Sequence, residues 1–149
     1  MALISVLYLW VQNKIVEMEK LKRAYCYLFY KLYKMSEAAP SRWLSHWKAS
    51  LAIMVLEIWL IAAILIYYKL FLNGDADIIG SNLIWVVMVL GIGLIDYYIF
   101  HNHDQWKNYI KEFDQLPKET SRRWGMWLWI IVALIIANFI FSFYLYYQI

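Results

Sequence analysis

Long apolar runs separated by short polar segments occupy the chain from Ala49 onward. The run from Ala49 to Tyr68 contains one charged residue, Glu57, and the run from Trp124 to Ile149 contains none. A helix over residues 124–147 would be about 36 Å long, which is enough to cross a hydrocarbon core of about 30 Å. The pattern predicts an all-α membrane protein with three transmembrane helices, at about 49–70, 80–100 and 124–147.

Before these runs, the segment from Lys14 to Met35 has the apolar period of a helix. Its apolar stripe comprises Met18, Leu21, Tyr25, Leu28, Phe29 and Leu32, and its opposite side carries Lys20, Arg23, Lys31 and Lys34. This predicts a basic amphipathic helix, which would lie among lipid headgroups or pack its stripe against the protein's own spans. A docking face for a partner helix is a third, less favoured interpretation.

The first residues form a separate apolar stretch, since Ala2 to Val11 is apolar apart from Ser5. It is about half the length of a span and lacks the basic start and the small-residue cleavage site of a signal peptide. We expect a helical segment packed on the membrane surface or partly inserted into it. Because Pro40 ends the N-terminal helical pattern, we expect a cytoplasmic segment over residues 1–40 and a transmembrane domain over residues 41–149.

The polar connections carry their own signals. Asn73-Gly74 is a turn dipeptide after the first span, and Gly91 and Gly93 would permit close approach of a neighbouring helix in the second. In the loop 101–123, apolar residues recur at helical spacing, so we expect the second span to run on as an amphipathic stub until Pro117. Thr120 or Ser121 would then cap the third span.

Basic residues are unevenly distributed between the predicted loops. Residues 1–48 contain eight Lys and Arg, the loop 101–123 contains five, including Arg122 and Arg123, and the connection between the first two spans contains only Lys69. Because basic loops stay in the cytoplasm, we expect the N-terminus inside and the C-terminus outside. The expected location is the cell membrane, meaning an inner or plasma membrane.

The composition supports a lipid environment and little else. The chain is 64% hydrophobic and 19% aromatic, which is more apolar surface than a soluble core of 149 residues can bury. The net charge of +3 lies on the predicted cytoplasmic face, which favours contact with anionic lipid headgroups over nucleic acid. The single cysteine, Cys26, excludes an intramolecular disulfide and is either an acylated thiol or, as we favour, a buried bystander.

Glu57 is the most anomalous residue, because a charged carboxylate in hydrocarbon costs a few kcal/mol unless it is paired or protonated. No Lys or Arg lies at a comparable depth in the predicted spans, so we expect Glu57 to be protonated and hydrogen-bonded to another helix. Two interpretations remain open. Glu57 either has a function, as a proton or cation relay or as a contact between subunits of an oligomer, or it is a structural carboxyl group that faces the bundle. We expect no second acidic residue at its depth in the membrane. Asp96 of the second span and Asn138 of the third are the other intramembrane polar residues that we single out, and Asn138 is expected to form a hydrogen bond between helices.

A second group of polar residues gathers at the predicted cytoplasmic ends of the first two spans. It comprises Asp96, His101, His103 and Asp104, together with His46. Imidazole and carboxylate ligands suit zinc, but only His101 and Asp104 have a workable helical spacing, so they are weak metal candidates. We expect ordinary interfacial residues and no bound metal or cofactor.

Catalytic signatures such as GxSxG, a P-loop or HExxH are absent from the sequence, so we do not expect an enzyme. The leading hypothesis is a small multi-pass protein that serves as an accessory or assembly subunit of a membrane complex, as a homo-oligomer or with a membrane-protein partner. The alternative is an oligomeric effector that leaks ions or permeabilises the membrane, with Glu57 lining the path, because three spans cannot enclose a pore alone.

Overall fold

A computed structural model describes residues 1–72 and 80–148, and these residues form helices without a strand. The elements are α1 (Ala2–Ala38), α2 (Ser45–Leu72), α3 (Asn82–Asp96), the π-helical turn η1 (Tyr97–His101), the 3-10 turn η2 (Asn102–Asp104), α4 (Gln105–Asp114) and α5 (Lys118–Gln148). Three helical stretches, Ser45–Leu72, Asn82–Asp114 and Lys118–Gln148, are long and apolar enough to cross a membrane. The predicted all-helical class and number of spans are confirmed, whereas the predicted Asn73-Gly74 turn lies outside the described residues.

The N-terminal apolar stretch and the segment predicted to be amphipathic form one continuous helix, α1, of 37 residues. Neither glycine nor proline occurs before Pro40, so no residue in this stretch interrupts the helical hydrogen bonds. The helix ends at Ala38, because the residue before a proline is disfavoured in helical conformation. At about 1.5 Å per residue, α1 is a rod of about 55 Å.

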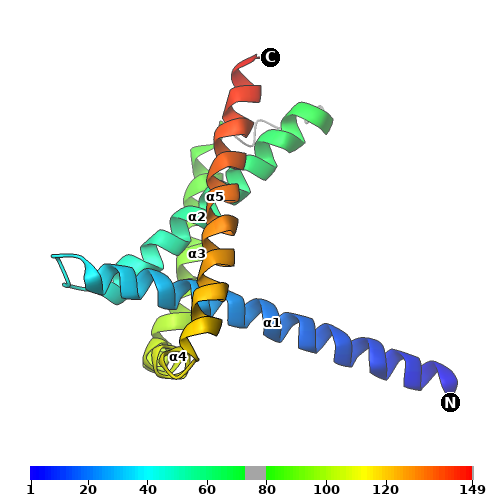
Figure 1. The fold of residues 1–149 in the computed structure, drawn as a ribbon. Coiled ribbons are helices and arrows are strands. Elements are labelled where there is room, and N and C mark those ends of the chain that lie inside the picture. The colour runs from blue at the N-terminus through cyan, green and yellow to red at the C-terminus, as the bar shows by residue number, and fades with distance from the viewer. Residues whose placement is uncertain (73–79, 149) are drawn as a thin grey trace.

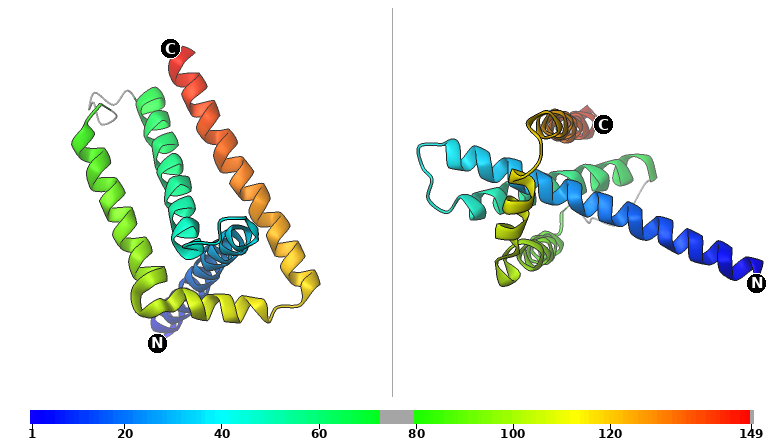
Figure 2. Two further views of the ribbon diagram at one scale, coloured as in Figure 1. Left: turned by 90° about the vertical axis from the view of Figure 1, so that its left-hand side faces the viewer. Right: turned by 60° about the horizontal axis from the view of Figure 1, so that its bottom comes forward.

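Helix α1 crosses the other long helices instead of running beside them (Figure 1). In Figure 2, left, α3, α4 and α5 form a U, with α4 as its base, and α1 passes inside the U next to α2. Contacts of α1 with both α2 and α4 agree with this view. The C-terminal part of α1 therefore lies between the spans, while its N-terminal part projects beyond them.

The core of the fold is built around this crossing. Five buried residues of α1 belong to it: Cys26, Tyr27, Phe29, Tyr30 and Leu32. Phe29 stacks on Phe100 with the ring centroids 4.3 Å apart, and Tyr27 meets Phe113 edge to face at 5.1 Å. Such aromatic pairs add about 0.5–1.5 kcal/mol each beyond area burial. The buried face of α1 thus packs against the protein itself from Cys26 onward.

The N-terminal end of the predicted stripe behaves differently. Met18 and Leu21 remain 68% and 71% exposed, and every residue from Met1 to Arg23 is exposed. The helical period of the sequence continues through this stretch, but the spans extend only as far as the region of Ala24. Periodicity predicts which face of a helix is apolar, and it does not predict how far along the helix that face finds a partner.

The connection from the second span to the third differs from the expected continuous helix. His103 and Asp104 have left-handed φ angles of 54° and 53°, so the chain turns sharply and α4 lies across the end of the bundle. Two consecutive left-handed residues cannot continue a right-handed helix, which is why the predicted stub is a separate element.

The predicted cap of the third span is also wrong. Helix α5 already begins at Lys118, and the Ser121 amide donates to the Pro117 carbonyl over 2.9 Å, so Thr120 and Ser121 lie inside the first turn. Proline is favourable at a helix start because its fixed φ suits the first turn and its missing N–H is not needed there. The Ser121 hydroxyl is thereby left to bind α1.

The two glycines of the second span have different surroundings. A methyl group added at Gly93 would lie 3.3 Å from the end of the Met54 side chain, whereas nothing lies within 4 Å of such a group at Gly91. The expected close approach of helices is therefore found at Gly93 and is not found at Gly91.

Candidate functional site

Three helices place a tyrosine and two carboxyl groups in direct contact. The Tyr25 hydroxyl, from α1, lies 2.6 Å from Oε1 of Glu57 in α2 and 2.5 Å from Oδ1 of Asp96 at the end of α3. We call these residues the Tyr25 triad. Tyr25 reaches this position because α1 passes inside the U, where its ring stacks on Phe100 with the centroids 5.3 Å apart.

The proton count of the triad follows from its geometry. A phenol has one hydroxyl proton, so Tyr25 can donate to only one of the two carboxyl groups. The other contact is a hydrogen bond only if that carboxyl group is protonated and donates to the phenol oxygen. Two oxygens at 2.5–2.6 Å without a proton between them would repel each other. At least one of the two carboxyl groups must therefore be protonated, in addition to the phenol.

Burial reinforces this arrangement. Asp96 is only 2% exposed, and its Oδ2 has no hydrogen-bond partner among the described residues. Burial raises the pKa of Tyr25, and its hydrogen bonds to Asp96 and Glu57 raise it further, so the phenol keeps its proton at neutral pH. The arrangement can hold a proton and share it among three helices.

The sequence did not predict this junction. The expectation that Glu57 has no partner acid at its level is wrong, because Tyr25 connects it to Asp96. The sequence places Asp96 both among the intramembrane polar residues and next to the histidines at the end of the span, and it places Tyr25 in an apolar stripe. The sequence does contain one signal of the site, since a polar group lies on each of three apolar helix faces. Which of these polar groups meet depends on how the helices cross.

Asn138 lies in a separate contact between α2 and α5. Its Oδ1 accepts a hydrogen bond of 2.8 Å from the Tyr67 hydroxyl, and the neighbouring Phe139 stacks on Trp59 with the centroids 5.1 Å apart. The expected hydrogen bond between helices is confirmed. Tyr67 lies farther along α2 than Glu57, so this contact is separate from the Tyr25 triad. It connects α2 and α5, the two spans that pack together most extensively.

The histidine cluster is brought together only in part. His46 stacks on Trp106 at 4.6 Å and His101 on Trp47 at 4.3 Å, and the two imidazole centroids are 5.6 Å apart. Nε2 of His101 lies 2.9 Å from the Ser50 hydroxyl. These two histidines thus act as aromatic packing groups between the start of α2 and the α3–α4 turn.

The other members of that cluster face outward. His103 and Asp104 are exposed, and Asp104 pairs with Lys107 over 3.2 Å. Among the described residues, no three His, Cys, Asp or Glu side chains are close enough together to hold a metal ion. The weak metal candidates, His101 and Asp104, therefore engage different partners.

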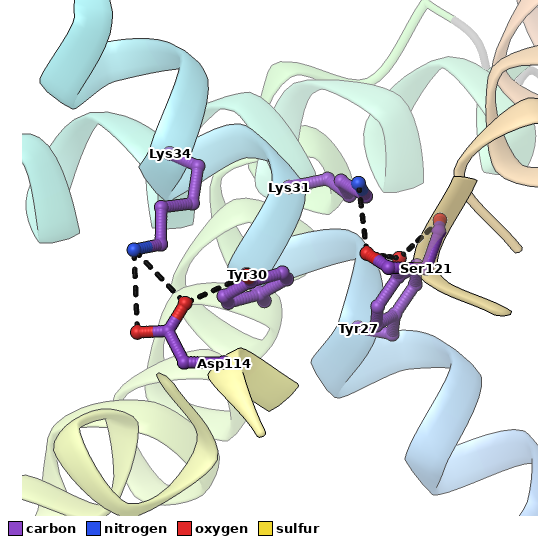
Figure 3. Close-up of polar contacts among 6 residues, drawn as sticks. All are labelled: Tyr27, Tyr30, Lys31, Lys34, Asp114 and Ser121. Atoms are coloured by element: carbon purple, nitrogen blue, oxygen red, sulfur yellow. Dashed lines mark hydrogen bonds and ion pairs between the residues drawn. The ribbon is translucent and has the colours of Figure 1, made fainter. Parts of the chain in front are cut away.

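Several basic residues of α1 bind the protein itself. Figure 3 shows Asp114 between Lys34 and Tyr30, with the Lys34 ammonium 2.9 Å from Oδ1 and the Tyr30 hydroxyl donating over 2.8 Å. Lys31 donates to the Ser121 hydroxyl over 3.3 Å, and the Tyr27 hydroxyl donates to the Ser121 carbonyl over 2.7 Å. These contacts attach α1 to both ends of the α4–α5 connection.

The other basic residues that the sequence analysis singles out are more exposed to solvent. Arg23 lies 3.7 Å from Glu112 at the surface, and Lys20, Arg122 and Arg123 are exposed. An exposed ion pair of that length contributes about 0–1 kcal/mol, so Glu112 holds Arg23 only weakly.

Cys26 is a buried thiol. It is 2% exposed, and burial raises its pKa, which disfavours the reactive thiolate. The interpretation as a buried bystander is supported, and acylation would require α1 to leave the core. No protein-family model, no curated protein and no solved structure matches this chain.

Proposed function

We propose that this small membrane protein is a non-enzymatic accessory or assembly subunit, which presents the N-terminal part of α1 to another integral membrane protein. The observation that carries the proposal is the exposed segment Ala2–Arg23, which we call the α1 arm. The arm is about 33 Å long at about 1.5 Å per residue and continues without a break into the anchored part of α1.

The anchoring of α1 makes the arm a rigid projection. Tyr25 joins α2 and α3 within the same helix turns that bury Cys26, Tyr27 and Phe29. A helix fixed at one end in this way holds its other end at a defined angle to the spans (Figure 1). Such preorganisation lowers the entropic cost of binding a partner.

The chemistry of the arm favours a protein partner over the membrane surface. An interfacial helix needs a polar face that stays among the headgroups. Ala2–Val11 has only Ser5 as a strongly polar residue, so it has no such face, and its large side chains are 45% exposed or more. Apolar helices of another membrane protein would cover this segment on all sides.

The ion-leak alternative has less support. A residue that lines an ion path must reach the path, and the Glu57 carboxyl is engaged by Tyr25 within the same chain. Glu57 therefore does not need a second copy of the chain to satisfy it. Flux of protons or cations through liposomes that contain the purified protein, abolished by Glu57→Gln, would favour the leak over our proposal.

Site-specific photocrosslinking in native membranes tests the proposal. A photoreactive residue at Leu7, which is 58% exposed on the arm, should yield one discrete adduct with another membrane protein. The matched control is Leu134 of α5, which is 63% exposed and faces away from the core, and it should yield lipid adducts only. The substitution Leu7→Arg should remove the partner from the purified complex without lowering the melting temperature.

The opposite results are equally clear. Only lipid adducts at Leu7, or only dimers of the chain itself, would contradict a heterologous partner. Equal protein adducts at Leu7 and Leu134 would show that the arm has no special role.

A further inference from the structure

A groove runs between α1 and α5, on the side where the arm leaves the spans. Lys20, Ala24 and Tyr27 are spaced so that they share one face of α1, and this face lies opposite the first turns of α5. One cavity of 340 Å³ opens between Lys20 and Arg23 of α1 and Thr120 and Trp124 of α5. Its volume is within the range of about 300–1,000 Å³ typical of ligand sites.

A second cavity of 340 Å³ continues along α5 toward the middle of the span. It is lined by Arg123, Trp127, Leu128 and Ile131, with Ala24 as the contribution of α1. Trp124 lines both cavities, so they adjoin there. The basic side chains Lys20 and Arg23 of the first cavity and Arg123 of the second lie near the α4–α5 connection and form the basic end of the groove, and the rest of the second cavity along α5 is apolar.

The charges at the basic end have few partners. Lys20 and Arg123 form no ion pair among the described residues, whereas Arg23 already lies 3.7 Å from Glu112. Lys20 and Arg123 are two cations without an acidic partner in the described part of the chain, and they lie next to the apolar part of the groove. This arrangement is complementary to a lipid with an anionic headgroup and an acyl chain. Basic pockets between helices at the membrane boundary are known to hold anionic headgroups.

We propose that the groove between α1 and α5 is a binding site for one anionic glycerophospholipid of the surrounding bilayer. The phosphate lies between Lys20 and Arg123, and an acyl chain runs past Trp124 along Leu128 and Ile131. The bound lipid fills the space between the two helices and so supports the angle of α1. The site uses only the last turn of the α1 arm, and its test does not depend on the protein partner proposed for Ala2–Val11.

The test uses the full chain in detergent, titrated with phosphatidylglycerol or phosphatidylcholine and followed by native mass spectrometry. The wild type should retain one phosphatidylglycerol and release phosphatidylcholine. The double substitution Lys20→Gln with Arg123→Gln should weaken binding about 25-fold, since each basic residue near an anionic lipid contributes a factor of about five. The substitution Ala24→Phe should fill the apolar end and abolish retention without changing the charge.

The matched control is Lys14→Gln with Arg122→Gln, which removes the same charge at exposed positions that line neither cavity. It should bind phosphatidylglycerol within about twofold of the wild type, because its groove is intact. If both double variants lose phosphatidylglycerol binding equally, the effect comes from general surface charge, and the proposal is overturned. Retention of phosphatidylcholine as strong as that of phosphatidylglycerol, or equal competition by glycerol 3-phosphate without acyl chains, would also overturn it.

Discussion

At the scale of single residues, Tyr25 joins three helices, because its phenol contacts carboxyl groups from two other helices. We expect Tyr25→Phe to lower the free energy of unfolding by about 1–3 kcal/mol, since it leaves buried carboxyl oxygens without a partner. Glu57→Gln should cost less than about 1 kcal/mol, because an amide N–H can donate to the phenol oxygen in place of the carboxyl proton. Thermal or denaturant unfolding in detergent micelles measures both.

The control for this comparison is Tyr147→Phe, which removes a hydroxyl from a side chain that is 80% exposed. Its unfolding should match that of the wild type. If Tyr25→Phe unfolds like Tyr147→Phe, or if Glu57→Gln is the more damaging change, the shared-proton description of the Tyr25 triad is incorrect.

At the scale of elements, the turn between α1 and α2 stores local strain. Leu44 has a left-handed φ of 53° immediately before α2 begins, which costs a non-glycine residue about 1–2 kcal/mol. Leu44→Asn should therefore stabilise the protein by about 1 kcal/mol, since asparagine tolerates this conformation through local hydrogen bonds. The melting temperature in detergent should rise by about 2–4 °C.

Leu44→Ala serves as the comparison, because it removes the same apolar contacts and keeps the unfavourable φ angle. Stabilisation by alanine as large as that by asparagine would assign the gain to lost surface hydrophobicity and not to the backbone.

At the scale of the whole molecule, the orientation is open to a direct measurement. Thirteen of the fourteen Lys and Arg residues lie in residues 1–48 or 101–123, whereas Lys69 lies in the last turn of α2, at its opposite end. We therefore expect the N-terminus and α4 in the cytoplasm. A reporter that is active only in the cytoplasm should be active at the N-terminus and silent at the C-terminus, and activity at the C-terminus would reverse the topology.

The structure adds to this orientation a consequence for the arm. Because α1 crosses the spans on the side of α4, the α1 arm and the α1–α5 groove would both lie at the cytoplasmic boundary of the bilayer. The lipid and the protein partner that we propose would then be recruited on the same side, where anionic lipids are concentrated.

The sequence by itself determined the number and approximate position of the spans. Whether a helix can cross the bilayer depends on the length of a local apolar run, and such runs can be counted without knowing what the helix contacts. The ends of helices near Pro40 and Pro117 were predictable for a similar reason, since proline acts on its immediate neighbours.

Only the tertiary structure decided where α1 lies and what its polar groups meet. Tyr25 is 32 positions from Glu57 and 71 from Asp96, and no local period relates residues at such distances. Their contact depends on the angle at which α1 crosses the U, which is set by packing such as that of Phe29 on Phe100. The same crossing opens the groove beside α5 and leaves the α1 arm outside the spans, because a straight helix longer than the bundle is wide must project beyond it.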